Sequence, residues 1–136
     1  MMFLDTNVLV YAFDKEEENK HKKAQDILTE CWSDRSGMLS TQVLQEFYVT
    51  VTRKLPKTLP KQEAREIIKE LSSWLTYQPA PADVIAASEL EEKHSLSFWD
   101  ALIIVAAQNS GATTLISEDM QDGRRIGALK IINPFR

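Results

Sequence analysis

Four acidic residues stand beside or inside apolar segments, where a carboxylate is costly unless something neutralises it. They are Asp5, Glu46, Asp100 and Asp119. The first directly follows Phe3-Leu4, the third interrupts the run FWDALIIVAA, and the last lies three residues beyond Ile116. Carboxylates that share a crevice repel one another and resist desolvation, so a cation must neutralise such a cluster. Oxygen ligands alone predict Mg²⁺ or Mn²⁺.

Each acid also has a structural interpretation. Asp5 is equally well explained as a helix cap or an Asx turn, and Asp100 as the third residue of a capping box opened by Ser97. Glu46 shares a polar helix stripe that predicts solvent exposure, and Asp119 fits a loop. The joint pattern favours a shared site, because acids after parallel strands and at the following helix starts converge on one crevice.

A metal ion held by carboxylates can activate water and stabilise an in-line displacement at phosphorus. The sequence has no G-x-x-x-x-G-K-[ST] or G-x-G-x-x-G loop and no G-x-S-x-G elbow. His21 and His94 stand among charged residues and are predicted to lie at the surface, whereas Cys31 has the spacing of a packed thiol. Zinc chemistry is therefore not expected.

Strands and helices are expected to alternate along the chain. We predict strands at 2–4, 37–39, 76–78, 113–116 and 129–132, and helices at 8–13, 17–33, 41–54, 61–74, 82–93 and 98–108. The charged run 14–23 is interpreted as the solvated start of the second helix. Short apolar strands between helices predict an α/β fold with a largely parallel sheet.

The composition predicts one domain over residues 1–136, because 43% of the residues are hydrophobic and Gly and Pro total nine. One cysteine excludes an internal disulfide and fits a reducing compartment. The apolar run 101–107 is too short to span a membrane and the start is unlike a signal peptide, so a cytoplasmic location is expected. The net charge of −4 is unusual for a nucleic-acid binder.

Four segments, in order, resemble the PIN-domain nucleases, and most closely their VapC-like toxins. The segments are FLDTNVLVY, STQVLQEFYVTVTRKL, SFWDALIIVAA and LISED, and the ending IINPF is also typical of the toxins. The resemblance covers essentially the whole chain. It implies a three-layer α/β/α sandwich around a largely parallel sheet.

The resemblance also implies an endoribonuclease that depends on Mg²⁺ or Mn²⁺ and serves as the toxin of a toxin–antitoxin pair. The family's four catalytic and metal-binding acids correspond to Asp5, Glu46, Asp100 and Asp119. The residues expected to support these acids are Thr6, Asn7, Ser117 and Asp122. Gly123 stands where the family often has Phe, which affects the expected shape of that loop.

The expected partners are an RNA substrate, a cognate antitoxin and a second copy of the chain. Large aromatic residues hint at interfaces, namely Trp32, Tyr48, Trp74 and Trp99. Candidate phosphate contacts are Arg53, Lys54, Lys57, Arg124 and Arg125. The alternatives are a housekeeping PIN nuclease without an antitoxin and a catalytically inactive binding module. A haloacid-dehalogenase-type phosphatase fits less well, because its second Asp is replaced by Asn7.

Overall fold

Six strands form one sheet in the order β3-β2-β1-β4-β6-β5 in the computed structural model, which describes residues 1–136. The strands are β1 (Met2–Leu4), β2 (Gly37–Ser40), β3 (Leu75–Tyr77), β4 (Thr114–Ile116), β5 (Arg125–Ile126) and β6 (Leu129–Ile132). All neighbouring strands are parallel except β5 and β6. The prediction of a largely parallel sheet is therefore confirmed.

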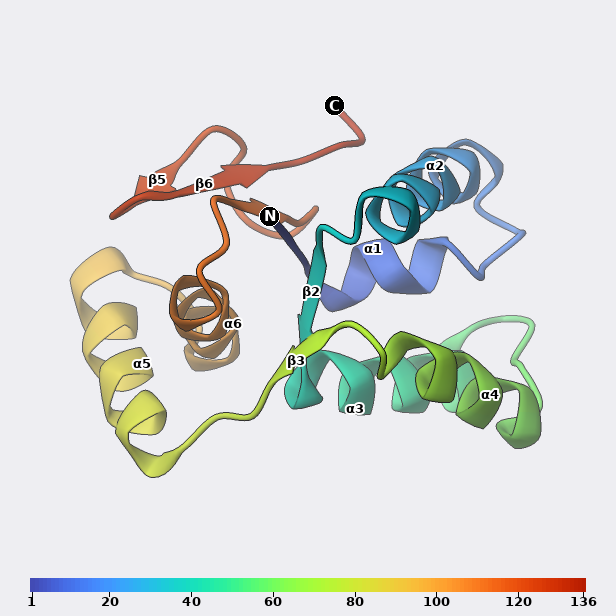
Figure 1. Ribbon diagram of the computed structural model, residues 1–136, viewed down its shortest axis with the longest axis horizontal. Helices are drawn as coiled ribbons and strands as arrows, with labels where there is room; N and C mark the ends of the chain where they lie inside the picture. Colours follow the sequence, from blue (N-terminus) through green and yellow to red (C-terminus); the bar gives the residue numbers. More distant parts are fainter.

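Helices cover both faces of the sheet. They are α1 (Thr6–Tyr11), α2 (Glu18–Asp34), α3 (Thr41–Val49), the π-helical turn η1 (Thr50–Lys54), α4 (Lys61–Leu71), α5 (Pro81–His94) and α6 (Phe98–Asn109). The chain moves outward from β1 to β3 through the first four helices and returns to β4 through the last two. Right-handed crossovers then place the two groups on opposite faces. Figure 1 shows α5 and α6 on the left and α1 to α4 on the right, which confirms the three-layer sandwich.

The core lies where the central strands meet the helices. Phe3, Leu39, Leu115 and Ile131 are fully buried, as expected for strands covered on both faces. Helix α6 buries seven consecutive residues from Ala101 to Ala107, which explains why its sequence is apolar on all sides. None of the helices has the length and hydrophobicity needed to cross a lipid bilayer.

The observed elements differ from the sequence prediction at several boundaries, and one helix end and one additional strand have a clear physical reason. The helix predicted over 61–74 ends at Leu71, where the Ser72 hydroxyl donates to the Lys69 carbonyl instead of letting the helix continue. Trp74 then turns inward onto β2, and a Cβ at Gly37 would lie only 2.3 Å from its ring. The sequence also did not predict β5, which returns antiparallel to β6 through Gly127 at φ 61°.

The charged run 14–23 is exposed from Lys15 to Asn19, as predicted for the solvated start of a helix, but its first residue departs from that prediction. Asp14 is buried, with 7% of its surface exposed, and α2 begins only at Glu18. Cys31 is buried as predicted, and burial raises the pKa of its thiol to about 11. It is therefore a packed residue and not a thiolate nucleophile at neutral pH.

Candidate active site

A pocket of about 700 Å³ opens beyond the carboxyl ends of β1 and β4. The connections lead in opposite directions from these two strands, and such a switch point is where open α/β sheets bind ligands. All four acids predicted from the sequence line this pocket. Asp5 follows β1, Glu46 lies on α3, Asp100 lies in the first turn of α6, and Asp119 follows β4.

Asp5 is both the N-cap of α1 and the most buried acid of the four. Its two carboxylate oxygens accept hydrogen bonds from the Thr6 backbone N–H at 2.7 Å and the Ser117 hydroxyl at 2.8 Å. Burial raises the pKa of Asp5 to about 6, and the charges of Asp100 and Asp119 act in the same direction, although the two hydrogen bonds oppose the shift. Asp5 therefore caps helix α1 and also lines the shared pocket.

The two residues after Asp5 hold two of the other acids. The Thr6 hydroxyl donates to Glu46 Oε1 at 2.7 Å, and Asn7 Nδ2 donates to Asp119 Oδ2 at 2.8 Å. Asn7 also accepts the Glu118 backbone N–H at 3.2 Å, which fixes the loop after β4. The hydrogen bonds of Thr6 and Asn7 thus orient carboxylates that are 40 and 112 residues away.

Asp100 likewise takes part in a helix cap and also lines the pocket. Its backbone N–H donates to the Ser97 hydroxyl at 3.1 Å, as the capping-box interpretation predicts. Its side chain faces the pocket, where burial first and then the charges of Asp119 and Glu46 raise its pKa. Burial is thus the main cause of the raised pKa of Asp100, and the charges of the two neighbouring carboxylates add to it.

Gln42 joins the two helices that carry Glu46 and Asp100. Its side-chain amide donates to the Trp99 carbonyl at 3.3 Å and lies 3.5 Å from Glu46 Oε2. Gln42 is buried, so this link from α3 to the start of α6 is shielded from water. It fixes the width of the pocket between the two helices.

The donor set fits a hard divalent cation. The four facing acids offer only oxygen ligands, and the buried Asp5 carboxylate would be stabilised in its charged form by a nearby positive ion. No three Asp, Glu, His or Cys side chains converge into a ready-made ion cage. Mg²⁺ does not need such a cage, because it keeps several waters and commonly binds through one or two carboxylates plus substrate phosphates.

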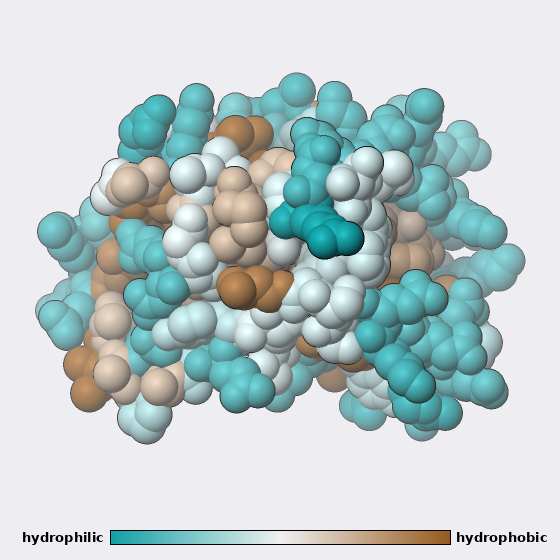
Figure 2. Space-filling model, viewed as in Figure 1, coloured by the Kyte–Doolittle hydropathy of each residue, from teal (hydrophilic) through white to brown (hydrophobic).

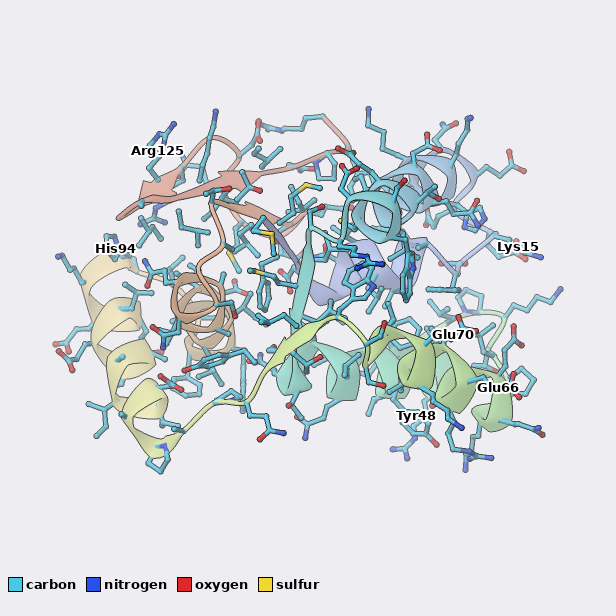
Figure 3. All side chains as sticks on the ribbon, in the orientation of Figure 1. Lys15, Tyr48, Glu66, Glu70, His94 and Arg125 are labelled. Atoms are coloured by element: carbon cyan, nitrogen blue, oxygen red, sulfur yellow. The ribbon has the colours of Figure 1, made fainter.

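Some of the residues that the sequence analysis predicted for the site lie outside the pocket. Asp122 does not line it and instead accepts the Asn133 backbone N–H at 2.8 Å, which ties its loop to the C-terminal segment. Of the five basic candidates, only Lys54 lines the pocket. Figure 3 shows His94 and Arg125 together at the left edge, on α5 and β5, away from α1 and α3. Neither histidine lines the pocket, in agreement with the sequence interpretation.

The pocket residues that the sequence analysis did not single out include Tyr11, Asp14 and Glu17. The sequence did contain a signal that Tyr11 lies near the site, because Tyr11 is the last residue of the short helix that Asp5 caps. Its hydroxyl donates to Glu118 Oε1 at 3.2 Å, and Lys20 forms an ion pair with the same oxygen at 2.9 Å. These contacts brace the loop that carries Asp119 against α1 and α2.

The fold is shared with known toxins. One similar solved structure is a toxin–antitoxin complex from Klebsiella pneumoniae, with 18% identity over 98% of each chain and a TM-score of 0.71. Another is VapC20 of Mycobacterium tuberculosis, described as a sarcin–ricin loop cleaving toxin, with 18% identity over 85% of this chain and 87% of that chain and a TM-score of 0.66. VapBC2 of Rickettsia felis, bound to a DNA fragment from its promoter, is also similar (25% identity over 96% of this chain and 97% of that chain, TM-score 0.65).

No curated protein matches the chain closely enough in sequence to count as a relative. The sequence profile of the PIN domain, in contrast, matches residues 2–126. This range includes all six acidic residues of the pocket, among them the four predicted from the sequence, and every strand except β6. The chain therefore belongs to the PIN domain family.

Proposed function

We propose that this protein is an endoribonuclease that requires Mg²⁺ or Mn²⁺ and acts as the toxin of a toxin–antitoxin pair. The observation that carries the proposal is the convergence of four carboxylates, from four separate elements, on one pocket at the switch point of the sheet. Membership of the PIN domain family and the structural similarity to VapC20 support the nuclease activity. The similarity to VapBC2 supports the toxin role.

In this proposal Asp5 and Asp100 bind the divalent ion, with Glu46 and Asp119 beside them or linked through water. A bound ion of this kind supplies Lewis acidity at a phosphate oxygen and lowers the pKa of water. Glu46 or Asp119 accepts the proton of the attacking water, since Asp119 Oδ1 accepts no hydrogen bond and Glu46 Oε2 has only the long 3.5 Å contact with Gln42. Ser117 and Asn7 keep the two acids of the β1 and β4 loops in place.

Removal of divalent ions should abolish cleavage of RNA, and Mn²⁺ should restore it. The expected reason is that uncompensated carboxylates repel the phosphate that they are meant to receive. The measurement is gel analysis of total RNA from the source cell after incubation with protein in EDTA, and then with excess Mn²⁺. Full cleavage in EDTA would contradict the metal mechanism. Metal binding without cleavage of RNA would favour an inactive binding module.

The toxin role includes two protein partners, a second copy of this chain and a cognate antitoxin. Exposed apolar side chains support an interface, because Val84 and Ile85 on α5 are 47% and 64% exposed and Trp32 is 42% exposed. Figure 2 shows brown, hydrophobic surface at the lower left, over the end of the molecule that α5 forms. Trp74, predicted to serve an interface, is instead buried against Gly37.

A homodimer is the expected state in solution. Light scattering at micromolar concentration should give twice the chain mass of 15.5 kDa. A matched comparison is Ile85→Glu, which places a charge on the exposed face of α5 and should shift the protein toward the monomer. A wild-type mass of one chain at all concentrations tested would contradict the dimer and leave the nuclease proposal intact.

A further inference from the structure

We infer that Lys54 binds a phosphate of the RNA strand beside the one that is cleaved, and that the π-helical turn η1 exists to place it there. The inference rests on the proposed nuclease function and adds a substrate contact to it. It starts from the charges of the pocket. Six acidic residues line it, and Lys54 is its only cationic residue. The acidic residues are Asp5, Asp14, Glu17, Glu46, Asp100 and Asp119.

The local sequence explains why the helix changes geometry before Lys54. Four β-branched residues in a row, Val49 to Thr52, disfavour an α-helix. The Thr52 hydroxyl donates to the Tyr48 carbonyl at 2.6 Å and so competes for an acceptor that an α-helix would use. The Leu55 N–H then reaches back five residues to the Thr50 carbonyl at 3.2 Å, which is the π-helical hydrogen bond.

This change selects which basic residue faces the acids. In a continuous α-helix the residue seven positions after Glu46, which is Arg53, would lie on the same face. The π-helical turn inserts one residue into that spacing, and Lys54 takes the place. The residues that line the pocket are consistent with this spacing, because they include Lys54 but not Arg53.

Lys54 is free to bind a substrate group. It is exposed, and it forms no hydrogen bond or ion pair within the chain, in which Lys20–Glu118 is the single salt bridge. Eight residues at 1.5 Å separate it from Glu46 by about 12 Å along the helix, and its side chain leans back toward the helix start. At that distance from the carboxylates its ammonium group meets a phosphate that flanks the cleaved one.

Lys54 and the adjacent Arg53 provide a matched pair of variants for a test of this inference. The substrate is an RNA oligonucleotide spanning a position that wild type cleaves in total RNA, and kcat and KM are measured with Mn²⁺ at several salt concentrations. Lys54→Gln should raise KM about tenfold with kcat nearly unchanged, as expected for the loss of one charge-assisted contact. The slope of log kcat/KM against log salt should become shallower by about 0.7, the value for one phosphate on a single strand.

Arg53→Gln removes the same charge one residue away and should leave both KM and the salt slope close to wild type. Lys54→Arg keeps a cation at the site and should restore most of the binding. Equal effects of Lys54→Gln and Arg53→Gln would overturn the inference, because general electrostatic attraction would then explain both. A fall in kcat at constant KM would also overturn it. A wild type that cleaves no RNA would instead contradict the proposed function on which it rests.

Discussion

Replacing Asp5 with Asn is expected to lower RNA cleavage by at least ~100-fold, because removal of a residue that merely supports a metal ligand already costs about 10- to 100-fold. Asn is nearly isosteric with Asp and caps a helix equally well, so the Thr6 contact at the start of α1 should persist. The measurement is the initial rate of cleavage with Mn²⁺. Asp26→Asn, at an exposed position of α2 outside the pocket, is the control and should retain wild-type activity.

The same variant should be more stable than wild type in EDTA at pH 7. The pKa of Asp5 is raised from 3.8 to about 6 in the folded protein, so the folded state holds a proton there that the unfolded chain releases. Stability is therefore lost as the pH rises from about 4 to 6, by up to about 3 kcal/mol. Melting curves in EDTA should show this loss in wild type and not in Asp5→Asn. Equal pH dependence in both proteins, with unimpaired cleavage, would contradict the assigned role of Asp5.

Asp100→Asn should separate a metal ligand from a helix cap. Asp100 is part of a capping arrangement with Ser97 and also faces the pocket. If it were only a cap, the variant would lose roughly 0.5–2 kcal/mol with or without metal. In the cluster, loss of its charge removes the cost of burying that charge and the repulsion from Asp119 and Glu46, which together raise its pKa. The variant should then melt in EDTA at the wild-type temperature or above.

Addition of Mn²⁺ should reverse that order. Wild type gains RT ln(1 + [L]/Kd), about 2.7 kcal/mol at a hundredfold excess over Kd, whereas the variant lacks a ligand and should gain much less. The experiment is a set of four melting curves, two proteins each in EDTA and in Mn²⁺. A variant that is less stable in EDTA yet keeps the whole Mn²⁺ shift would establish Asp100 as a cap and place the metal elsewhere.

The predicted convergence of the four acids on one pocket follows from topology. Asp5 comes directly after β1 and Asp119 three residues after β4, and the carboxyl ends of parallel strands meet at one edge of the sheet. Asp100 and Glu46 lie on apolar helices whose packing against the sheet was readable from their composition. The helix bounds were predicted within a few residues for the same reason, since apolar periodicity and capping residues are local signals.

The parts that the sequence did not reveal depend on contacts between distant residues. Asp14 looked like one charge in a solvated run, and only its position at the pocket shows that it is buried. Trp74 looked available for an interface, and only the absence of a side chain at Gly37 lets its ring turn inward. The extra residue in the π-helical turn η1 changes which basic residue faces the acids. Helical periodicity read from the sequence does not reveal this change, because it assumes the same number of residues in every turn.

The pairing of β1 with β4 has a consequence for how the protein is made. Asp5 is translated 112 residues before its hydrogen-bond partner Ser117. At about 5–20 residues per second, this interval is roughly 6–22 seconds. During that time the first strand has no β4 neighbour and the pocket has no Asp119. The proposed active site therefore stays incomplete on the nascent chain until the loop that carries Asp119 has been translated.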